Sequence, residues 1–226
     1  MARKPFLQST TLWDFPSQNY AGPPQGDINF TGATPSYVIW NCIQKYTLPN
    51  DLVIDPFCGS GTMPDVARET NRQARGYDIA PRRPDITYAS ADKIPLGSGK
   101  AALVFMDPPY SDHINYSDNP RCIGKLSAFS PEYFTRMEKA IKEAHRVLKH
   151  NGYLALYVCD FFKVRRGFAP VGFKLFSISE KIFTPVDIIT VTRHNKDLQK
   201  GNYHKAAVKE NFYLRGFNYL FIFQKN

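Results

Sequence analysis

Short apolar runs that stop at polar or turn-forming residues recur along the chain. Five of them lie within the first 160 residues, at 51–55 (DLVID), 74–80 (ARGYDIA), 86–92 (ITYASAD), 102–107 (ALVFMD) and 153–160 (YLALYVCD). Two more lie near the end, at 187–193 (DIITVTR) and 218–225 (NYLFIFQK). Runs of this length, bounded by turn residues, are typical of buried strands. The pattern therefore predicts seven strands.

Apolar residues at helical spacing separate several of these runs. Pro35 is expected to open a helix, with Thr34 as its N-cap. A long amphipathic helix is expected over 131–149, and shorter helices over 65–70 and near 171–183. Only a few residues around PRRP join the second strand to the third, so no helix is expected between them.

The alternation of strands and helices predicts an α/β fold with a mostly parallel sheet covered by helices on both faces. The last two strands have no clear helix between them and are expected to join one edge in antiparallel orientation. The sequence thus predicts a seven-stranded mixed sheet in a single domain over 34–226. An irregular N-terminal arm rich in Pro, Gly, Asn and Ser is expected over 1–33.

No apolar segment has the length of a signal-peptide core or of a membrane span, so we expect a cytoplasmic protein without membrane contact. The cysteines are widely spaced and form no CxxC pair, which favours reduced thiols and no metal site. They are Cys42, Cys58, Cys122 and Cys159. The sequence does not indicate an oligomeric state.

The net charge of the chain points to a polyanionic partner. Its formal value is +9 at pH 7. A positive field concentrates polyanions, so nucleic acid is the first partner to consider and an anionic membrane the second. Solubility alone is an alternative explanation of the charge.

The stretch VIDPFCGSGT contains a glycine turn between a strand ending at Asp55 and a helix starting near Thr62. Gly59 and Gly61 allow a tight turn and a close approach of a ligand to backbone N–H groups. The motif is neither GxGxxG nor a phosphate-binding loop. A plain strand-to-helix turn is therefore an open alternative for the motif taken alone.

Acidic residues stand at three successive strand ends, which packing alone does not explain. They are Asp55, Asp78 and Asp92. Carboxylates are costly to bury without a partner, and Asp78 lies about 20 residues after the glycines, where Rossmann-type sites place a ribose-binding carboxylate. A ligand with a ribose, an adenine amino group and a cationic centre would satisfy all three.

The run LVFMDPPY ends a strand on Asp107, Pro108, Pro109 and Tyr110. Two consecutive prolines have fixed φ angles and no N–H groups, so this turn offers hydrogen-bond acceptors only. A planar amino group fits such a turn, because it can donate to the Asp107 carboxylate and to the Pro108 carbonyl. Tyr110 adds a face on which a flat ring can stack.

With these two motifs the sequence resembles the S-adenosylmethionine-dependent amino methyltransferases, which modify adenine N6 or cytosine N4. The similarity runs from about Thr11 to Asp160, and the resemblance implies a Rossmann-like fold. DPFCGSGT resembles the family's cofactor motif, DPPY its catalytic motif, and TPSYVIWNCI its helix over the amino-acid end of the cofactor. The resemblance implies a cofactor site made of Thr34, Pro35, Asp55, Phe57, Gly59, Gly61, Asp78 and Asp92. It implies catalytic roles for Asp107, Pro108, Pro109 and Tyr110.

Only about fifty residues separate the two motifs, which leaves no room there for a target-recognition domain. Loops, a partner or a structured RNA must then determine the target. One candidate loop follows DPPY and contains His113, Tyr116, Arg121 and Lys125. A basic aromatic loop over about 193–216 is the second, with Arg193, Lys196, Lys200 and Lys205.

The resemblance implies methyl transfer from S-adenosylmethionine to an exocyclic amino group of DNA. The same chemistry on structured RNA such as ribosomal RNA is an alternative. A non-catalytic nucleic-acid-binding subunit is an alternative of another class, and methylation of a small molecule is disfavoured by the charge.

Overall fold

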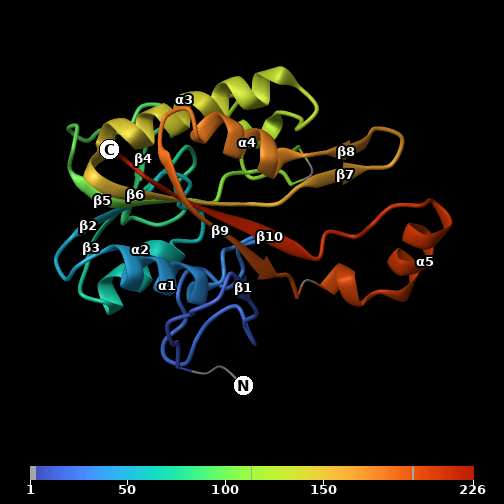
Figure 1. The fold of residues 1–226 in the computed structure, drawn as a ribbon, viewed down its shortest axis with the longest axis horizontal. Coiled ribbons are helices and arrows are strands. Elements are labelled where there is room, and N and C mark those ends of the chain that lie inside the picture. Colours follow the sequence, from blue (N-terminus) through green and yellow to red (C-terminus); the bar gives the residue numbers. More distant parts are fainter. Residues whose placement is uncertain (1–3, 113, 195) are drawn as a thin grey trace.

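A mixed sheet with helices on both faces forms the centre of the molecule (Figure 1). The structure, a computed structural model, describes residues 4–112, 114–194 and 196–226. The strands of the main sheet are β1 (Leu12–Trp13), β2 (Leu52–Asp55), β3 (Gln73–Asp78), β4 (Ile86–Tyr88), β5 (Ala101–Met106), β6 (Leu148–Val158), β9 (Thr184–Thr192) and β10 (Phe217–Gln224). A separate hairpin is made of β7 (Phe161–Lys163) and β8 (Gly167–Ala169). The helices are α1 (Ser36–Tyr46), α2 (Thr62–Glu69), η1 (Ile123–Lys125), α3 (Pro131–Val147), α4 (Val171–Ser179), η2 (Lys196–Gln199) and α5 (Gly201–Lys209).

The strand order is β1-β9-β10-β6-β5-β2-β3-β4. Strands β4, β3, β2, β5 and β6 are parallel to one another, and β10 is antiparallel to both β6 and β9. The predicted α/β architecture is confirmed, as is the direct connection from β3 to β4 without a helix.

The predicted strand number, seven, is wrong, because the main sheet has eight strands. The additional strand is β1, in which Leu12 and Trp13 pair with Thr190 and Val191 of β9. The buried indole of Trp13 holds this segment on the sheet. A two-residue strand has no alternating run that a pattern could reveal.

Strand β5 lies at the centre of the sheet and is buried along its whole length. Successive side chains of a strand point to opposite faces. Val104 and Met106 accordingly pack in the core beneath α3 and α4, whereas Leu103 and Phe105 pack in the core beneath α1 and α2. Burial on both faces explains the unbroken apolar run that predicted this strand.

The N-terminal arm packs against α1. Phe15 stacks on Tyr37 with ring centroids 5.0 Å apart. Pro35 is the N-cap of α1, so the prediction of Thr34 as the cap is wrong. The ψ angle of Pro35 is 128°, so the helix begins only after this residue, and the Thr34 hydroxyl instead donates a hydrogen bond to Asp107.

The basic segment 193–216 contains η2 and α5, where the sequence suggested a loop. Only Ala207 of α5 is buried, so the helix has no buried apolar stripe from which the sequence pattern could predict it. Among the described residues, no helix is both long enough and apolar enough to cross a membrane.

A hydrogen bond from the Tyr133 hydroxyl supports the DPPY turn, and its contribution to stability can be tested. Tyr133 is fully buried on α3 and donates to the Pro109 carbonyl over 2.9 Å. We expect Tyr133→Phe to lower the free energy of unfolding by about 1–2 kcal/mol, because a buried acceptor loses its donor. Urea denaturation measures the change. The exposed Tyr88→Phe in β4 is the control, and equal stability of both variants would contradict the role of this bond.

Candidate active site

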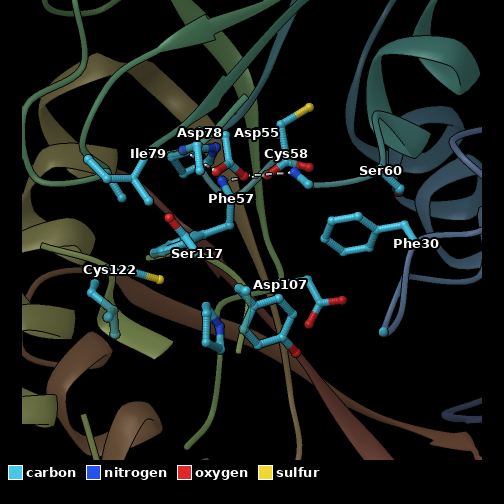
Figure 2. A pocket seen from close by; sticks show the side chains of 18 of the residues that line it. Phe30, Asp55, Phe57, Cys58, Ser60, Asp78, Ile79, Asp107, Ser117 and Cys122 are labelled. Carbon is cyan, nitrogen blue, oxygen red and sulfur yellow. Dashed lines mark hydrogen bonds between the residues drawn. The ribbon is translucent and has the colours of Figure 1, made fainter. Parts of the chain in front are cut away.

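A cavity lies at the carboxyl ends of β2, β3 and β5, which are adjacent in the sheet. Figure 2 shows Asp107 across this cavity from Asp55 and Asp78, with Phe30 to one side. The predicted site residues that line it are Thr34, Asp55, Phe57, Gly59, Asp78, Asp107, Pro109, Tyr110, Tyr116 and Arg121. Parallel strands bring residues far apart in sequence to one edge of the sheet, where ligands of such sheets bind.

Carboxylates hold the backbone of the glycine turn in place. Asp78 accepts hydrogen bonds from Gly59 N and Ala80 N, both over 2.9 Å, and Asp55 accepts one from Phe57 N over 2.9 Å. These bonds explain why acidic residues end both strands. Each carboxylate oxygen retains a second lone pair, with which it can accept a donor from a ligand.

Gly61 has a structural role in the turn and does not line the cavity. Its φ of 81° lies in the left-handed region, and a Cβ there would meet the Arg83 guanidinium at 2.4 Å. Arg83 pairs with Asp65 through two contacts of 2.8 Å and also with Asp85. This cluster holds the start of α2 against the segment after β3.

Among the residues predicted for the cofactor and catalytic sites, Pro35, Asp92 and Pro108 also lie outside the lining of this cavity. Pro35 lines the neighbouring cavity described below. Asp92 accepts a hydrogen bond from the Ser90 hydroxyl, and it is Ser90 that reaches the cavity wall.

Asp107 is the carboxylate on which the site centres. The Thr34 hydroxyl donates to its Oδ2 over 2.5 Å. Burial raises the pKa of Asp107 to about 7, although Thr34 and the positive charge of Arg193 act in the opposite direction. Near neutral pH this group therefore exchanges a proton readily.

The Asp55 carboxyl is costly to ionise in this site. Burial raises the pKa of its carboxyl well above the usual range, and the charges of Asp107 and Asp78 raise it further. A positive centre bound among these carboxylates would favour their ionised forms. The lining thus fits a ligand that combines a cation with hydroxyl groups, as S-adenosylmethionine does.

A second cavity meets the first at Asp107 and Tyr110. Its lining includes Arg193 at the end of β9, together with Tyr157 of β6. Buried side-chain oxygens without a hydrogen-bond partner also belong to residues in this lining, and they come from Asn19, Gln25 and Asn218. Unsatisfied buried polar atoms are uncommon in folded proteins and need an explanation.

Sequence reasoning missed several of these residues. Asn218 gave a readable signal, because it is a polar residue in the apolar run of β10. Phe30 gave none, yet its ring lies against Gly59, where a Cβ would meet it at 2.8 Å. Phe30 also stacks with Tyr116, and the Arg82 guanidinium lies 5.1 Å from its ring centroid. Together these three side chains form part of the cavity wall.

The predicted nucleic-acid-binding residues divide between the cavities and the outer surface. Tyr116 and Arg121 line the first cavity and Arg193 the second. Lys125 in η1, Lys200 and Lys205 line neither. His113 lies outside the described residues, and so does the side chain of Lys196.

All four cysteines are buried free thiols. Within the described ranges, no group of three or more His, Cys, Asp or Glu side chains is arranged to hold a metal ion.

Comparisons with known proteins all find similarity to methyltransferases. A family model for N6 and N4 methyltransferases, described as DNA methylase, matches residues 4–89. This match includes the glycine turn and Asp78 but ends before Asp107. The type II methyltransferase M.Cfr9I of Citrobacter freundii is 33% identical over 81 residues, which cover 36% of this chain and 25% of that protein. The matched segment is thus about a quarter of that relative's length.

Solved structures of other proteins resemble most of the chain. TrmN from Thermus thermophilus has a TM-score of 0.55 and 15% identity, over 87% of this chain and 50% of that one. A SAM-dependent methyltransferase from Methanosarcina mazei has a TM-score of 0.53 and 13% identity, over 81% of this chain and 96% of that one. Residues 4–89 are therefore similar to the N6 and N4 DNA methylases, and the chain has the fold of the S-adenosylmethionine-dependent methyltransferases.

Proposed function

We propose that this protein transfers a methyl group from S-adenosylmethionine to an exocyclic amino group, adenine N6 or cytosine N4, of a DNA base. The observation that carries the proposal is that Asp107 and Tyr110 line both cavities. A cofactor in the first cavity and a base in the second would meet at these two residues. The family match of residues 4–89 supports the same class of reaction.

The first cavity is suited to the cofactor. S-adenosylmethionine, when bound, supplies a methyl group on a positively charged sulfur. Asp55 and Asp78 would face that charge and the ribose hydroxyls, and the buried N-terminal turn of α2 would lie beside its amino-acid end. Phe30 and Tyr116 would exclude water from one side of it.

Asp107 is suited to activate the amino group of the base, whose lone pair is delocalised into the ring. Thr34 occupies Oδ2 of Asp107, which leaves Oδ1 for an amino hydrogen. A hydrogen bond to Asp107 favours the pyramidal nitrogen that attacks the methyl carbon. The N–C bond forms as the S–C bond breaks, and Asp107 can accept the proton that the amino group loses. Tyr110 offers its ring for stacking on the base.

Structured RNA is the alternative substrate, because the chain between β3 and β5 contains only β4 and no separate recognition domain. A non-catalytic binding subunit is the alternative of another class. Such a subunit has no need of a buried carboxylate where two cavities meet. The experiments below separate these possibilities.

Labelled methyl transfer to duplex DNA, single-stranded DNA and ribosomal RNA tests the proposed function directly. We expect label on duplex DNA and its loss by a factor of about 100 or more in Asp107→Asn, because one fixed acceptor in the transition state is removed. Nucleoside analysis identifies the methylated base. Glu180→Gln, an exposed carboxylate at the end of α4, is the matched control.

Binding of the cofactor by calorimetry completes this experiment. Label on RNA alone would show that RNA is the substrate and would contradict the choice of DNA. Cofactor binding without transfer to any pool, or transfer that persists in Asp107→Asn, would contradict the assigned chemistry.

The pH dependence of methyl transfer should report the ionisation of Asp107. Its carboxylate must be ionised to accept a hydrogen, and its pKa is about 7. The value of kcat/KM, which reports the free enzyme, should therefore fall about tenfold per pH unit below pH 7. Thr34→Val removes a bond that favours the ionised form, so it should move this acid limb to higher pH. The exposed Thr135→Val should not, and an identical profile in both variants would argue against Asp107 as the titrating group.

A further inference from the structure

The hairpin of β7 and β8 projects from the molecule next to the segment that contains α5 (Figure 1). The two are in contact, because Phe162 of β7 stacks on Phe212 with ring centroids 4.5 Å apart. The Arg215 guanidinium also lies 5.2 Å from the Phe168 ring centroid of β8. The hairpin and the basic segment thus form one surface feature.

This feature begins at the rim of the second cavity. Arg193, the first residue of the basic segment, lines that cavity. The hairpin starts directly after β6, in which Tyr157 lines the same cavity and Cys159, just beyond the strand, accepts a hydrogen bond from Arg193. The hairpin and the basic segment therefore both start beside the second cavity, which Asp107 also lines.

Most of the net charge of the chain is concentrated here. Residues 161–169 and 193–216 together contain nine Lys and Arg against two acidic residues, a net charge of +7 out of +9 for the chain. The hairpin itself has three basic residues and none that is acidic. A surface of this kind favours a polyanion.

The tip of the hairpin presents its basic side chains to solvent. Lys163, Arg165 and Arg166 are exposed. Arg166 is anchored, since its guanidinium lies 4.7 Å from the Phe129 ring centroid and 3.4 Å from the Ser127 hydroxyl. No ion pair joins Lys163 or Arg165 to an acidic residue of the described ranges. The tip is thus braced at Arg166, with two cations directed outward.

We propose that the hairpin of β7 and β8 is a phosphate-binding arm for duplex DNA that flanks the target base, with Lys163 and Arg165 as its contacts. The proposal rests on the proposed function, because a base extruded into the second cavity must come from a duplex held at its rim. Phosphate contacts orient a protein on DNA without reading sequence. The hairpin would thus provide some of the DNA backbone contacts that a separate recognition domain could otherwise provide.

The salt dependence of binding tests this arm. The dissociation constant for a duplex of about 20 base pairs is measured by fluorescence anisotropy between about 0.05 and 0.3 M salt, with wild type and Lys163→Gln/Arg165→Gln. Loss of two phosphate contacts should lower the slope of log K against log salt concentration by about 1.8 and weaken binding about tenfold per contact near 0.1 M salt. Lys100→Gln/Lys139→Gln removes the same charge from exposed sites at the amino end of β5 and on α3, and should leave the slope unchanged.

The outcomes separate this inference from the proposed function. A slope equal to that of the control variant would overturn the arm, even if wild type methylates DNA. Binding of structured RNA with the predicted slope change, and no binding of duplex DNA, would overturn the choice of partner. If the double variant shows the expected change in slope but the wild-type protein methylates no DNA, the phosphate-binding arm is supported and the proposed function fails. Unchanged cofactor affinity of the double variant shows that it is folded.

Discussion

The hydrogen bond from Thr34 to Asp107 connects the N-terminal segment to the carboxyl end of the central strand. Thr34 belongs to the segment that leads into α1, and Asp107 ends the central strand β5. The bond holds the N-terminal segment across the carboxyl end of the sheet, and both cavities have Asp107 and Thr34's neighbour Ala33 in their walls. A buried carboxylate needs such a donor, because burial without one is costly. The position of Asp107 therefore depends on chain segments 73 residues apart.

Charge is distributed unevenly over the molecule in a way that suits two different ligands. Carboxylates gather at the ends of β2, β3 and β5, where a small cation would relieve their mutual repulsion. The net positive charge is concentrated on the hairpin and on the segment that contains α5. Arg193 stands between these regions and counters the effect of burial on Asp107. A cationic cofactor and an anionic polymer would thus approach Asp107 from different sides.

The sequence allowed prediction of what local pattern determines. Apolar runs located the seven longer main-sheet strands, and the acidic residue after each run placed Asp55, Asp78 and Asp107 at one edge. Parts that depend on distant contacts escaped prediction. Strand β1 exists through pairing with β9, and the hairpin is held by aromatic contacts to Phe212 and Phe129. The roles predicted from the family resemblance for the individual site residues stay predictions.

A crystal structure with S-adenosylhomocysteine and a duplex containing the target base would test the central claim most directly. We expect the cofactor product in the first cavity, beside Asp55, Asp78 and Phe30, and the extruded base in the second. The exocyclic amino group should lie within hydrogen-bond distance of Asp107 Oδ1, with Tyr110 against the base. A cofactor bound elsewhere, or a base whose amino group does not reach Asp107, would contradict the account.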